Sequence, residues 1–374
     1  MSADPNRELG LTWSSELELD TSALGADPFA GCDGTAQTDP TQDKLCYFHT
    51  RGEFSSFTSR VTGSNRASDV RINYAVFRPE SGIEDAAIVF VTGRTESYVK
   101  YAEFVYDLMH RNSHLNYTLY MIDHRGQGLS SRLLVSRDPA GDDGSRMPVA
   151  STAAAPGGAD DPHHHRGFVY AFDDFVVDLK TFIDEVVHAD AHRGKVIMIA
   201  HSMGGGIATR YLQQHGADGQ LTGAILTSPM NQILALDNGS GGFIDPDQAK
   251  QALVCGAALT GNGWRYTLGG SDWSAGEFAT NPVTSSQARF DHVNYLNSSV
   301  PHIKLGAATN RWACESFKAT GEMRKPEQAA KMDLPIVLFQ AEADQIVGAQ
   351  GQKDVCDGAP NCLLDVVAGA EHEP

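Results

Sequence analysis

One serine in this chain stands where a hydroxyl group could act as a nucleophile. Residues 196–200 form a short apolar run, typical of a strand buried on both faces, and residues 206–214 change to helical spacing. Ser202 lies between them, with Ala200 and Gly204 on either side. A sharp strand-to-helix turn needs small residues at these two positions because the neighbouring backbones crowd there. The pattern predicts a nucleophile elbow at Ser202, with an ordinary strand-to-helix turn as the alternative.

Two partners for this serine follow in the downstream sequence. A hydroxyl is a poor nucleophile unless an imidazole removes its proton, and the imidazole needs a carboxylate that fixes its tautomer. Residues 334–339 are strand-like and are followed by Asp344. Residues 362–367 are also strand-like and are followed by His372. Because open parallel sheets place their chemistry at the carboxyl ends of strands, these residues and Ser202 predict a catalytic triad.

A triad of this kind also needs an oxyanion hole built from two backbone amides. Met203, directly after the nucleophile, supplies the first. Residues 86–91 read as another buried strand, and residues 92–97 form the turn that follows it. Arg94 in this turn is the candidate for the second amide, with a plain strand-to-helix turn as the alternative.

Several segments of the chain resemble α/β-hydrolases of the lysophospholipase and monoacylglycerol lipase group, the serine aminopeptidase-like family, and bacterial lysophospholipases in particular. The matching segments are 92–103, with Thr92 where many relatives have His, 123–130 with the pattern D-x-R-G-x-G-x-S, 200–205 with A-H-S-M-G-G, 340–347 and 369–373. The resemblance covers the chain from about residue 50 to its last residue.

This resemblance implies a fold and an activity. The fold is an α/β-hydrolase fold, with a mostly parallel central sheet, helices on both faces and an inserted cap. The activity is hydrolysis of a carboxylic ester on a single-chain lipid, carried by Ser202, Asp344 and His372. Glu342 stays a reserve candidate because some relatives carry Glu at the acid position. A serine hydrolase requires no cofactor and no metal.

We expect four segments along the chain. Residues 1–50 lack sustained periodicity and are interpreted as an extended N-terminal arm or a lead-in to the core. Residues 51–230 are expected as the first part of the core, residues 231–332 as the cap, and residues 333–374 as the second part of the core. The chain ends two residues after His372, where relatives continue into a helix. We therefore expect a truncated core with a loosely held histidine, or a histidine loop that is held in some other way.

The cap is where the acyl-chain pocket is expected, because a cap covers the nucleophile and excludes water. Candidate lining residues are Trp264, Trp273, Phe278, Trp312 and Phe317, for which simple core packing is the alternative.

An insertion at residues 136–165 ends in three histidines, 163–165. Adjacent side chains do not share one helix face, and no cysteine or carboxylate cluster accompanies them at ligand spacing. We therefore expect a solvent-exposed loop rather than a metal site.

Charge excludes one class of partner. The 374 residues carry 29 Lys and Arg against 47 Asp and Glu, a formal net charge of −18. Such a chain is a poor nucleic-acid binder and gains nothing electrostatically from an anionic bilayer. No run approaches the roughly 20 apolar residues that span a membrane, so any peripheral membrane contact is expected through the cap. The sequence leaves the oligomeric state open.

Six cysteines form an even set. Cys32 pairs with Cys46, Cys255 with Cys314 and Cys356 with Cys362 in one arrangement among several that six cysteines allow. Disulfides would indicate a periplasmic or extracellular protein. The alternative is a cytoplasmic or peripheral inner-membrane protein with free thiols.

Two other functions stay open. An aminopeptidase would need acidic groups in the cap to bind a free amine, and Asp245, Asp272 and Glu277 are available there. A non-catalytic binding protein on the same scaffold is the third hypothesis, although such proteins usually lose a member of the triad.

Overall fold

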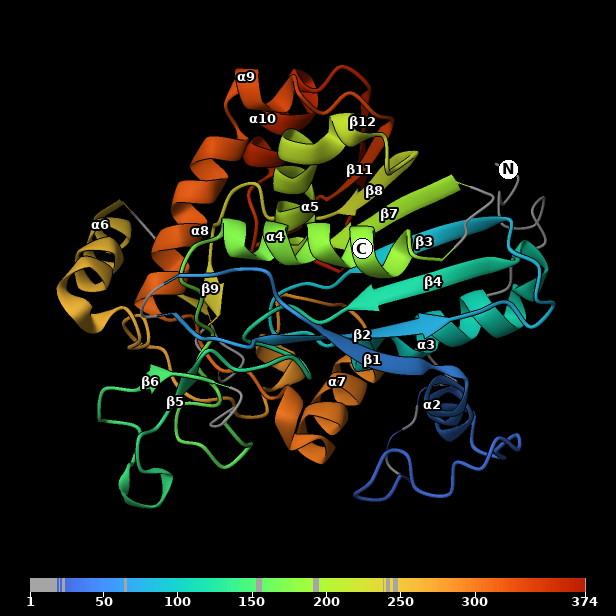
Figure 1. Cartoon of the computed structure of the whole chain (residues 1–374), viewed down its shortest axis with the longest axis horizontal. Coiled ribbons are helices and arrows are strands. Elements are labelled where there is room, and N and C mark those ends of the chain that lie inside the picture. Colours follow the sequence, from blue (N-terminus) through green and yellow to red (C-terminus); the bar gives the residue numbers. More distant parts are fainter. Residues whose placement is uncertain are drawn as a thin grey trace.

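The central element of the molecule is a single mixed sheet (Figure 1). The computed structural model describes residues 19, 21, 24–63, 66–152, 157–190, 195–237, 239, 243–244 and 248–373. In these ranges eight strands pair in the order β1-β2-β4-β3-β7-β8-β11-β12. Their bounds are β1 Glu53–Thr58, β2 Arg71–Phe77, β3 Ala86–Val91, β4 Tyr117–Ile122, β7 Lys195–His201, β8 Gly223–Thr227, β11 Ile336–Ala341 and β12 Cys362–Val367. The first two strands run antiparallel to their neighbours, and the six from β4 to β12 are parallel.

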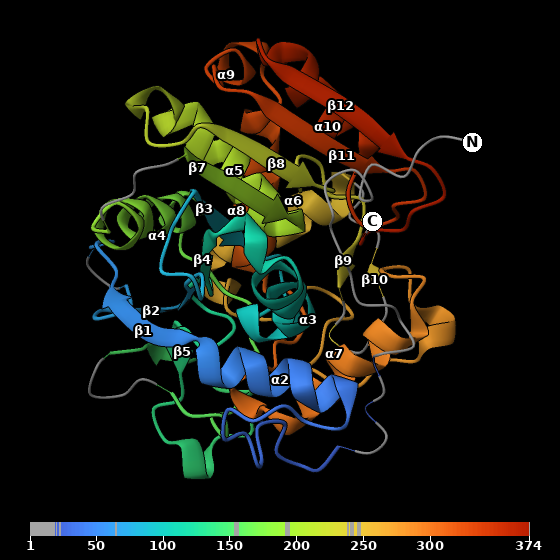
Figure 2. The same cartoon turned by 90° about the vertical axis from the view of Figure 1, so that its right-hand side faces the viewer.

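Helices cover both faces of this sheet, as the all-buried strand β3 requires. Ala87 and Val89 of β3 pack into the core that contains residues of α4 (Asp173–Phe182) and α5 (Ser202–His215). Ile88 and Phe90 pack into the other core, against α2 (Pro40–Arg51) and α3 (Ala102–Tyr106). Figure 2 shows α4 on one side of the strands and α3 on the other.

The region expected as an extended arm, residues 1–50, contains most of helix α2, so this expectation is wrong from Pro40 onward. Asp39 caps the helix by accepting a hydrogen bond from the amide of Gln42 at 2.8 Å. Leu45 and Phe48 are buried in the second core. The helix was missed because its first turns are polar.

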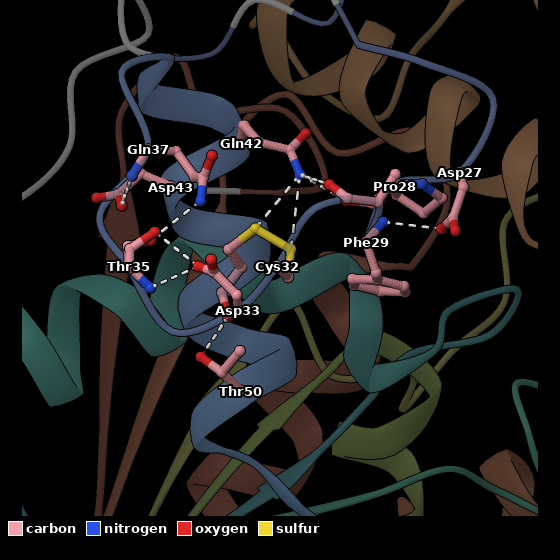
Figure 3. Close-up of a disulfide and its surroundings, with 12 residues drawn as sticks. Asp27, Pro28, Phe29, Cys32, Asp33, Thr35, Gln37, Gln42, Asp43 and Thr50 are labelled. Carbon is pink, nitrogen blue, oxygen red and sulfur yellow. Dashed lines mark hydrogen bonds between the residues drawn. A yellow bond between two sulfur atoms is a disulfide. The ribbon is translucent and has the colours of Figure 1, made fainter.

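A disulfide between Cys32 and Cys46 fastens the preceding loop to α2 (Figure 3). The side-chain amide of Gln42 lies beside it, 3.3 Å from Cys46 Sγ, and also donates to the carbonyl oxygen of Pro28 at 3.3 Å. This loop therefore packs as part of the molecule.

The helical segment over residues 98–111 changes its winding twice. A 3₁₀ turn η2 (Tyr98–Tyr101) precedes α3, and a π turn η3 (Asp107–Arg111) follows it. Ser97 accepts a hydrogen bond from the amide of Val99 and so caps η2.

The insertion at residues 136–165 is not the exposed loop we expected for its histidines. Strand β5 (Leu134–Val135) pairs with β6 (Val149–Ala150), and His163 and His164 are buried. Nε2 of His164 lies 3.0 Å from the carbonyl oxygen of His302, and Nε2 of His163 lies 3.2 Å from Oδ2 of Asp142. These polar partners allow the imidazoles to leave water.

A helical segment lies between β8 and β11 in the chain, and we propose residues 231–332 as the cap. Its elements are β9 Leu236–Asp237, β10 Phe243–Ile244, α6 Gln248–Ala257, η8 Ala258–Asn262, η9 Phe278–Thr280, α7 Gln287–Ser299, η10 Pro301–Ile303, α8 Asn310–Met323 and α9 Pro326–Ala329. The remaining elements are η4 Ser113–Leu115, η5 Pro139–Gly141, η6 Ile183–Val187, η7 Gly216–Asp218 and α10 Ala349–Gly358. In the described ranges no helix has both the length and the apolar character to cross a membrane.

All six cysteines are paired, and the arrangement is the one named above among the several that the sequence allows. Cys255 joins Cys314 across 59 residues, and Cys356 joins Cys362 across 6. A disulfide that closes a longer loop removes more entropy from the unfolded chain.

We therefore expect the two pairs to differ in their contribution to stability. Replacing Cys255 and Cys314 by Ser should lower the free energy of unfolding by about 4 kcal/mol, against about 2 kcal/mol for Cys356 and Cys362. Urea unfolding of the two double variants measures this. The reverse order would contradict the loop-entropy argument.

Candidate active site

Ser202 sits at the junction of β7 and α5 with a left-handed backbone, φ 53°. Few non-glycine residues adopt this conformation, and they cluster at functional sites. The turn brings α5 against the end of β3: a Cβ on Gly204 would lie 2.3 Å from the carbonyl oxygens of Val91 and Thr92. Glycine is therefore required at 204, as the sequence predicted.

The three residues predicted as a triad meet at the carboxyl ends of their strands. The hydroxyl of Ser202 donates to Nε2 of His372 at 2.8 Å. Nδ1–H of His372 donates to Oδ2 of Asp344, also at 2.8 Å. The side chains of His372 and Asp344 are 6% and 5% exposed. This geometry allows the imidazole to take the serine proton while the carboxylate holds its tautomer.

The structure places Asp344 rather than Glu342 at the histidine. Oδ1 of Asp344 accepts hydrogen bonds from the amides of Ile346 at 2.8 Å and Val347 at 3.0 Å, which leaves Oδ2 for His372. Glu342 instead accepts from the amide of Gly369 at 2.8 Å. The local turn thus aims the aspartate.

The candidate oxyanion donors lie on either side of Ser202. The amide of Met203 is in the first turn of α5, where N–H groups have no partner within the helix. A Cβ on Gly93 would lie 3.2 Å from Cβ of Ser202, so the loop after β3 passes directly beside the nucleophile. The side chain of Arg94 leaves this loop toward the cap and donates to the carbonyl oxygen of Gly306 at 2.7 Å. Its guanidinium lies over the ring of Trp312.

Residues that the sequence did not single out hold the oxyanion loop. Gln127 donates to the carbonyl oxygens of Gly93 at 2.7 Å and Glu96 at 2.9 Å. Asp123 accepts from the Ser97 hydroxyl and the Tyr98 amide, both at 2.7 Å. Both anchors belong to the D-x-R-G-x-G-x-S segment, so the motif was the signal that could have identified them.

The last described residues are held in place, against the expectation of a loose terminus. The amide of Glu373 donates to the carbonyl oxygen of Val283 in the cap at 2.9 Å. The carboxylate of Glu373 pairs with Lys100, which also lies 2.6 Å from Glu96. His372 is accordingly buried.

The residues around Lys100 also include potential metal ligands. Glu96, His201 and Glu373 bring potential ligand atoms within 4.8 Å of one another. The ammonium of Lys100 bonds to both carboxylates, and Nδ1 of His201 lies 3.1 Å from the Thr227 hydroxyl. The positive charge at this position therefore comes from the protein itself.

A cavity of about 210 Å³ opens at Ser202 and His372. Its wall includes apolar residues near the triad and in the cap, among them Met230, Ile233, Leu236, Phe290, Val293, Leu305, Trp312, Ile346 and Val347. Of the aromatic candidates for this lining, Trp273 and Trp312 contribute to it. Trp264, Phe278 and Phe317 are outside the described wall, and Trp264 instead packs against Arg166.

Comparisons with known proteins identify a family of hydrolases. A family model described as serine aminopeptidase, S33, matches residues 82–374. Lysophospholipase L2 of Escherichia coli (strain K12) is 32% identical over 289 residues, 77% of this chain and 72% of that protein. A probable lysophospholipase L2 of Haemophilus influenzae is 26% identical over 321 residues, 86% of this chain and 87% of that protein.

Solved structures share the fold. A carboxyl esterase from Bacillus coagulans has a TM-score of 0.58 at 16% identity, covering 87% of this chain and 92% of that one. A monoglyceride lipase variant from Saccharomyces cerevisiae has a TM-score of 0.54 at 17% identity, covering 86% and 88%.

Two buried histidines at the site should make the protein sensitive to acid. Burial lowers the pKa of His201 to about 4 although Glu96 opposes it, and lowers that of His124 to about 4 although the Thr92 carbonyl opposes it. Both folded-state values lie below the ordinary 6.5, so the stability they contribute is complete above pH 6.5 and is lost as the pH falls toward 4.

As the pH falls from 6.5 toward 4, we expect protonation linked to each histidine to lower the free energy of unfolding by about 1 kcal/mol per pH unit. Urea unfolding at pH 7.0, 5.5 and 4.5 would measure the slope. His124→Gln, which keeps a donor for Thr92 but does not titrate, should lower the slope by one proton. An unchanged slope would contradict the assignment.

Proposed function

Because this chain belongs to the serine aminopeptidase S33 family, we propose that it is a serine hydrolase that cleaves carboxylic esters of single-chain lipids through an acyl-enzyme. The expected α/β-hydrolase fold, with its mostly parallel sheet covered on both faces, is confirmed. The observation that carries the proposed chemistry is the hydrogen-bonded series Ser202, His372 and Asp344 at the cavity.

In the first half of the reaction His372 acts as general base. It accepts the proton of Ser202 as the hydroxyl oxygen attacks the ester carbonyl carbon. The amides of Met203 and Arg94 are assigned to the oxyanion of the tetrahedral intermediate. His372 then gives its proton to the leaving alcohol, and the acyl group stays on Ser202. Asp344 stabilises the imidazolium in between.

The second half of the reaction releases the acyl group. His372 removes a proton from a water molecule, which attacks the acyl carbon, and the same amides hold the second oxyanion. Return of the proton to Ser202 frees the fatty acid and restores the enzyme. Every step uses groups of the protein and water.

The cavity and the relatives indicate the class of substrate. The apolar wall of the cavity near Ser202 fits an acyl chain. The curated relatives are named lysophospholipases, and one solved structure is a monoglyceride lipase. We therefore propose a lysophospholipid or a monoacylglycerol as substrate.

The aminopeptidase alternative has less support. The carboxylates in the described cavity wall are Glu96 and Glu373, and both are already ion-paired with Lys100. Asp272 and Glu277 are not among the described wall residues, and Asp245 lies outside the described residues. The binding-protein alternative gains nothing from a site whose triad is complete.

The location and the membrane contact are further parts of the proposal. Three disulfides favour an oxidising compartment, the periplasm or the extracellular space, over the cytoplasm. Leu253 and Leu259 in the cap are 58% and 83% exposed and would be the first groups to contact a lipid surface. With the net charge of −18, such contact would be apolar rather than electrostatic.

The test of function is a panel of three substrates. Purified protein is given a lysophosphatidylcholine, a monoacylglycerol and leucine p-nitroanilide, and fatty acid or nitroaniline release is measured. We expect fatty acid release, with a loss of about 10⁶-fold in kcat for Ser202→Ala. Cleavage of the anilide alone would replace the proposal by the aminopeptidase, and a fully active Ser202→Ala would remove the triad assignment.

The two carboxylates give a matched pair of variants. Asp344→Asn keeps the side-chain size but removes the charge that holds His372, and should lower kcat about 10⁴-fold. Glu342→Gln alters an exposed contact with Gly369 and should change kcat little. Steady-state rates on the preferred ester decide, and a larger loss for Glu342→Gln would mean that the acid has been misassigned.

A further inference from the structure

Lys100 carries a partly buried positive charge beside the triad. Its Nζ lies 2.6 Å from Oε1 of Glu96 and also donates to Oε1 of Glu373, and its side chain is 16% exposed. Burial alone would lower the pKa of Lys100, but Glu373 and Glu96 raise it well above its ordinary range. The ammonium therefore stays charged at every pH at which an esterase works.

The two carboxylates belong to different parts of the catalytic machinery. Glu373 directly follows His372, and its amide donates to Val283 of the cap. Glu96 lies in the oxyanion loop, where its Oε2 accepts from the amide of Gly93 and from the hydroxyl of Tyr101. One ammonium thus contacts the loop of the general base and the loop of the oxyanion donor.

Both loops need such a link because each follows a different strand. The histidine loop follows the edge strand β12, and the oxyanion loop follows β3 near the middle of the sheet. Burial of the two carboxylates without a cation would be costly, so the charges hold the two loops together.

We propose that Lys100 is a positioning residue for the ester hydrolysis, an inference that rests on the proposed function. By binding Glu373 and Glu96 at one ammonium, it keeps His372 aligned with Ser202 and fixes Gly93 and Arg94 where the oxyanion forms. The competing reading is direct contact with substrate, because Lys100 also lines the cavity.

The two readings differ in which kinetic constant changes. A lost contact that binds substrate and transition state equally raises KM, whereas misalignment of the reacting groups lowers kcat. For Lys100→Met, which keeps the apolar stem and removes the charge, we expect kcat on p-nitrophenyl octanoate to fall about 100-fold with KM within about twofold. Labelling by a fluorophosphonate should slow in parallel.

Further variants identify the partners. Lys100→Arg keeps the charge, and its kcat should be about tenfold higher than that of Lys100→Met. Glu373→Gln should lower kcat about tenfold, and the double variant Lys100→Met, Glu373→Gln should be no slower than Lys100→Met, since groups that act as a unit are not additive. Lys180→Met is the control. Lys180 pairs with Asp184 at 2.6 Å, and these two residues are also four positions apart, on α4 and its extension. Removing the charge of Lys180 should leave kcat unchanged.

The outcomes separate the two proposals. An active wild type with unchanged kcat in Lys100→Met, a change in KM alone, or strictly multiplicative losses in the double variant would overturn the role of Lys100 and leave the proposed function standing. If Lys100→Met does not fold, wild-type kcat in Glu373→Gln overturns it. A wild type that neither hydrolyses an ester nor reacts with the fluorophosphonate would overturn the proposed function itself.

Discussion

The left-handed backbone of Ser202 is the constraint on which the rest of the site depends. A φ of 53° at the end of β7 turns the chain sharply and presses the first turn of α5 against the end of β3. The backbone of β3 then leaves no room for a side chain at position 204. Because β3 and β7 pair in parallel, the loop after β3 emerges at the same edge of the sheet as the elbow. The oxyanion loop is therefore beside the nucleophile as a direct consequence of strand pairing, and Gly93 passes against Ser202. The strain of one residue and the register of two strands together define the reacting centre.

The other two triad members reach the same edge through β11 and β12, which pair in parallel over their full lengths. Parallel strands align their carboxyl ends, so the loops that carry Asp344 and His372 start side by side although 28 positions separate the two residues. What the sheet does not determine is the final approach of each loop to Ser202. On the acid side the amides of Ile346 and Val347 orient the carboxylate. On the base side the contact with the cap and the pair with Lys100 do so.

The parts that could be predicted from the sequence are those set by local pattern and chain order. A buried strand ending in small residues identifies the elbow, and the order serine, acid, histidine after successive strands identifies the triad without knowledge of any contact. The parts that were missed depend on partners far away in the chain. The imidazoles of His163 and His164 are buried beside Asp142 and the carbonyl oxygen of His302, and helix α2 is stabilised by an apolar face that meets α3 and β2 only in the folded molecule. Lys100 and Glu373 are 273 residues apart, so no periodicity could join them.

The contrast between Lys100 and His201 shows how burial selects the charges that remain near the triad. His201 is buried and Lys100 partly buried, and both lie close to Glu96. The ammonium has two carboxylates at bonding distance, whereas Nε2 of His201 is 4.0 Å from Glu96. Burial therefore prevails for the imidazole, lowering the pKa of His201 to about 4, and the ring stays neutral near pH 7. This matters because the rings of His201 and His372 lie 5.0 Å apart. A second imidazolium at that distance would oppose the positive charge that His372 takes up from Ser202. His201 is neutral, and the charge of Lys100 is compensated by its two carboxylates. Neither neighbour therefore opposes the positive charge that develops on His372.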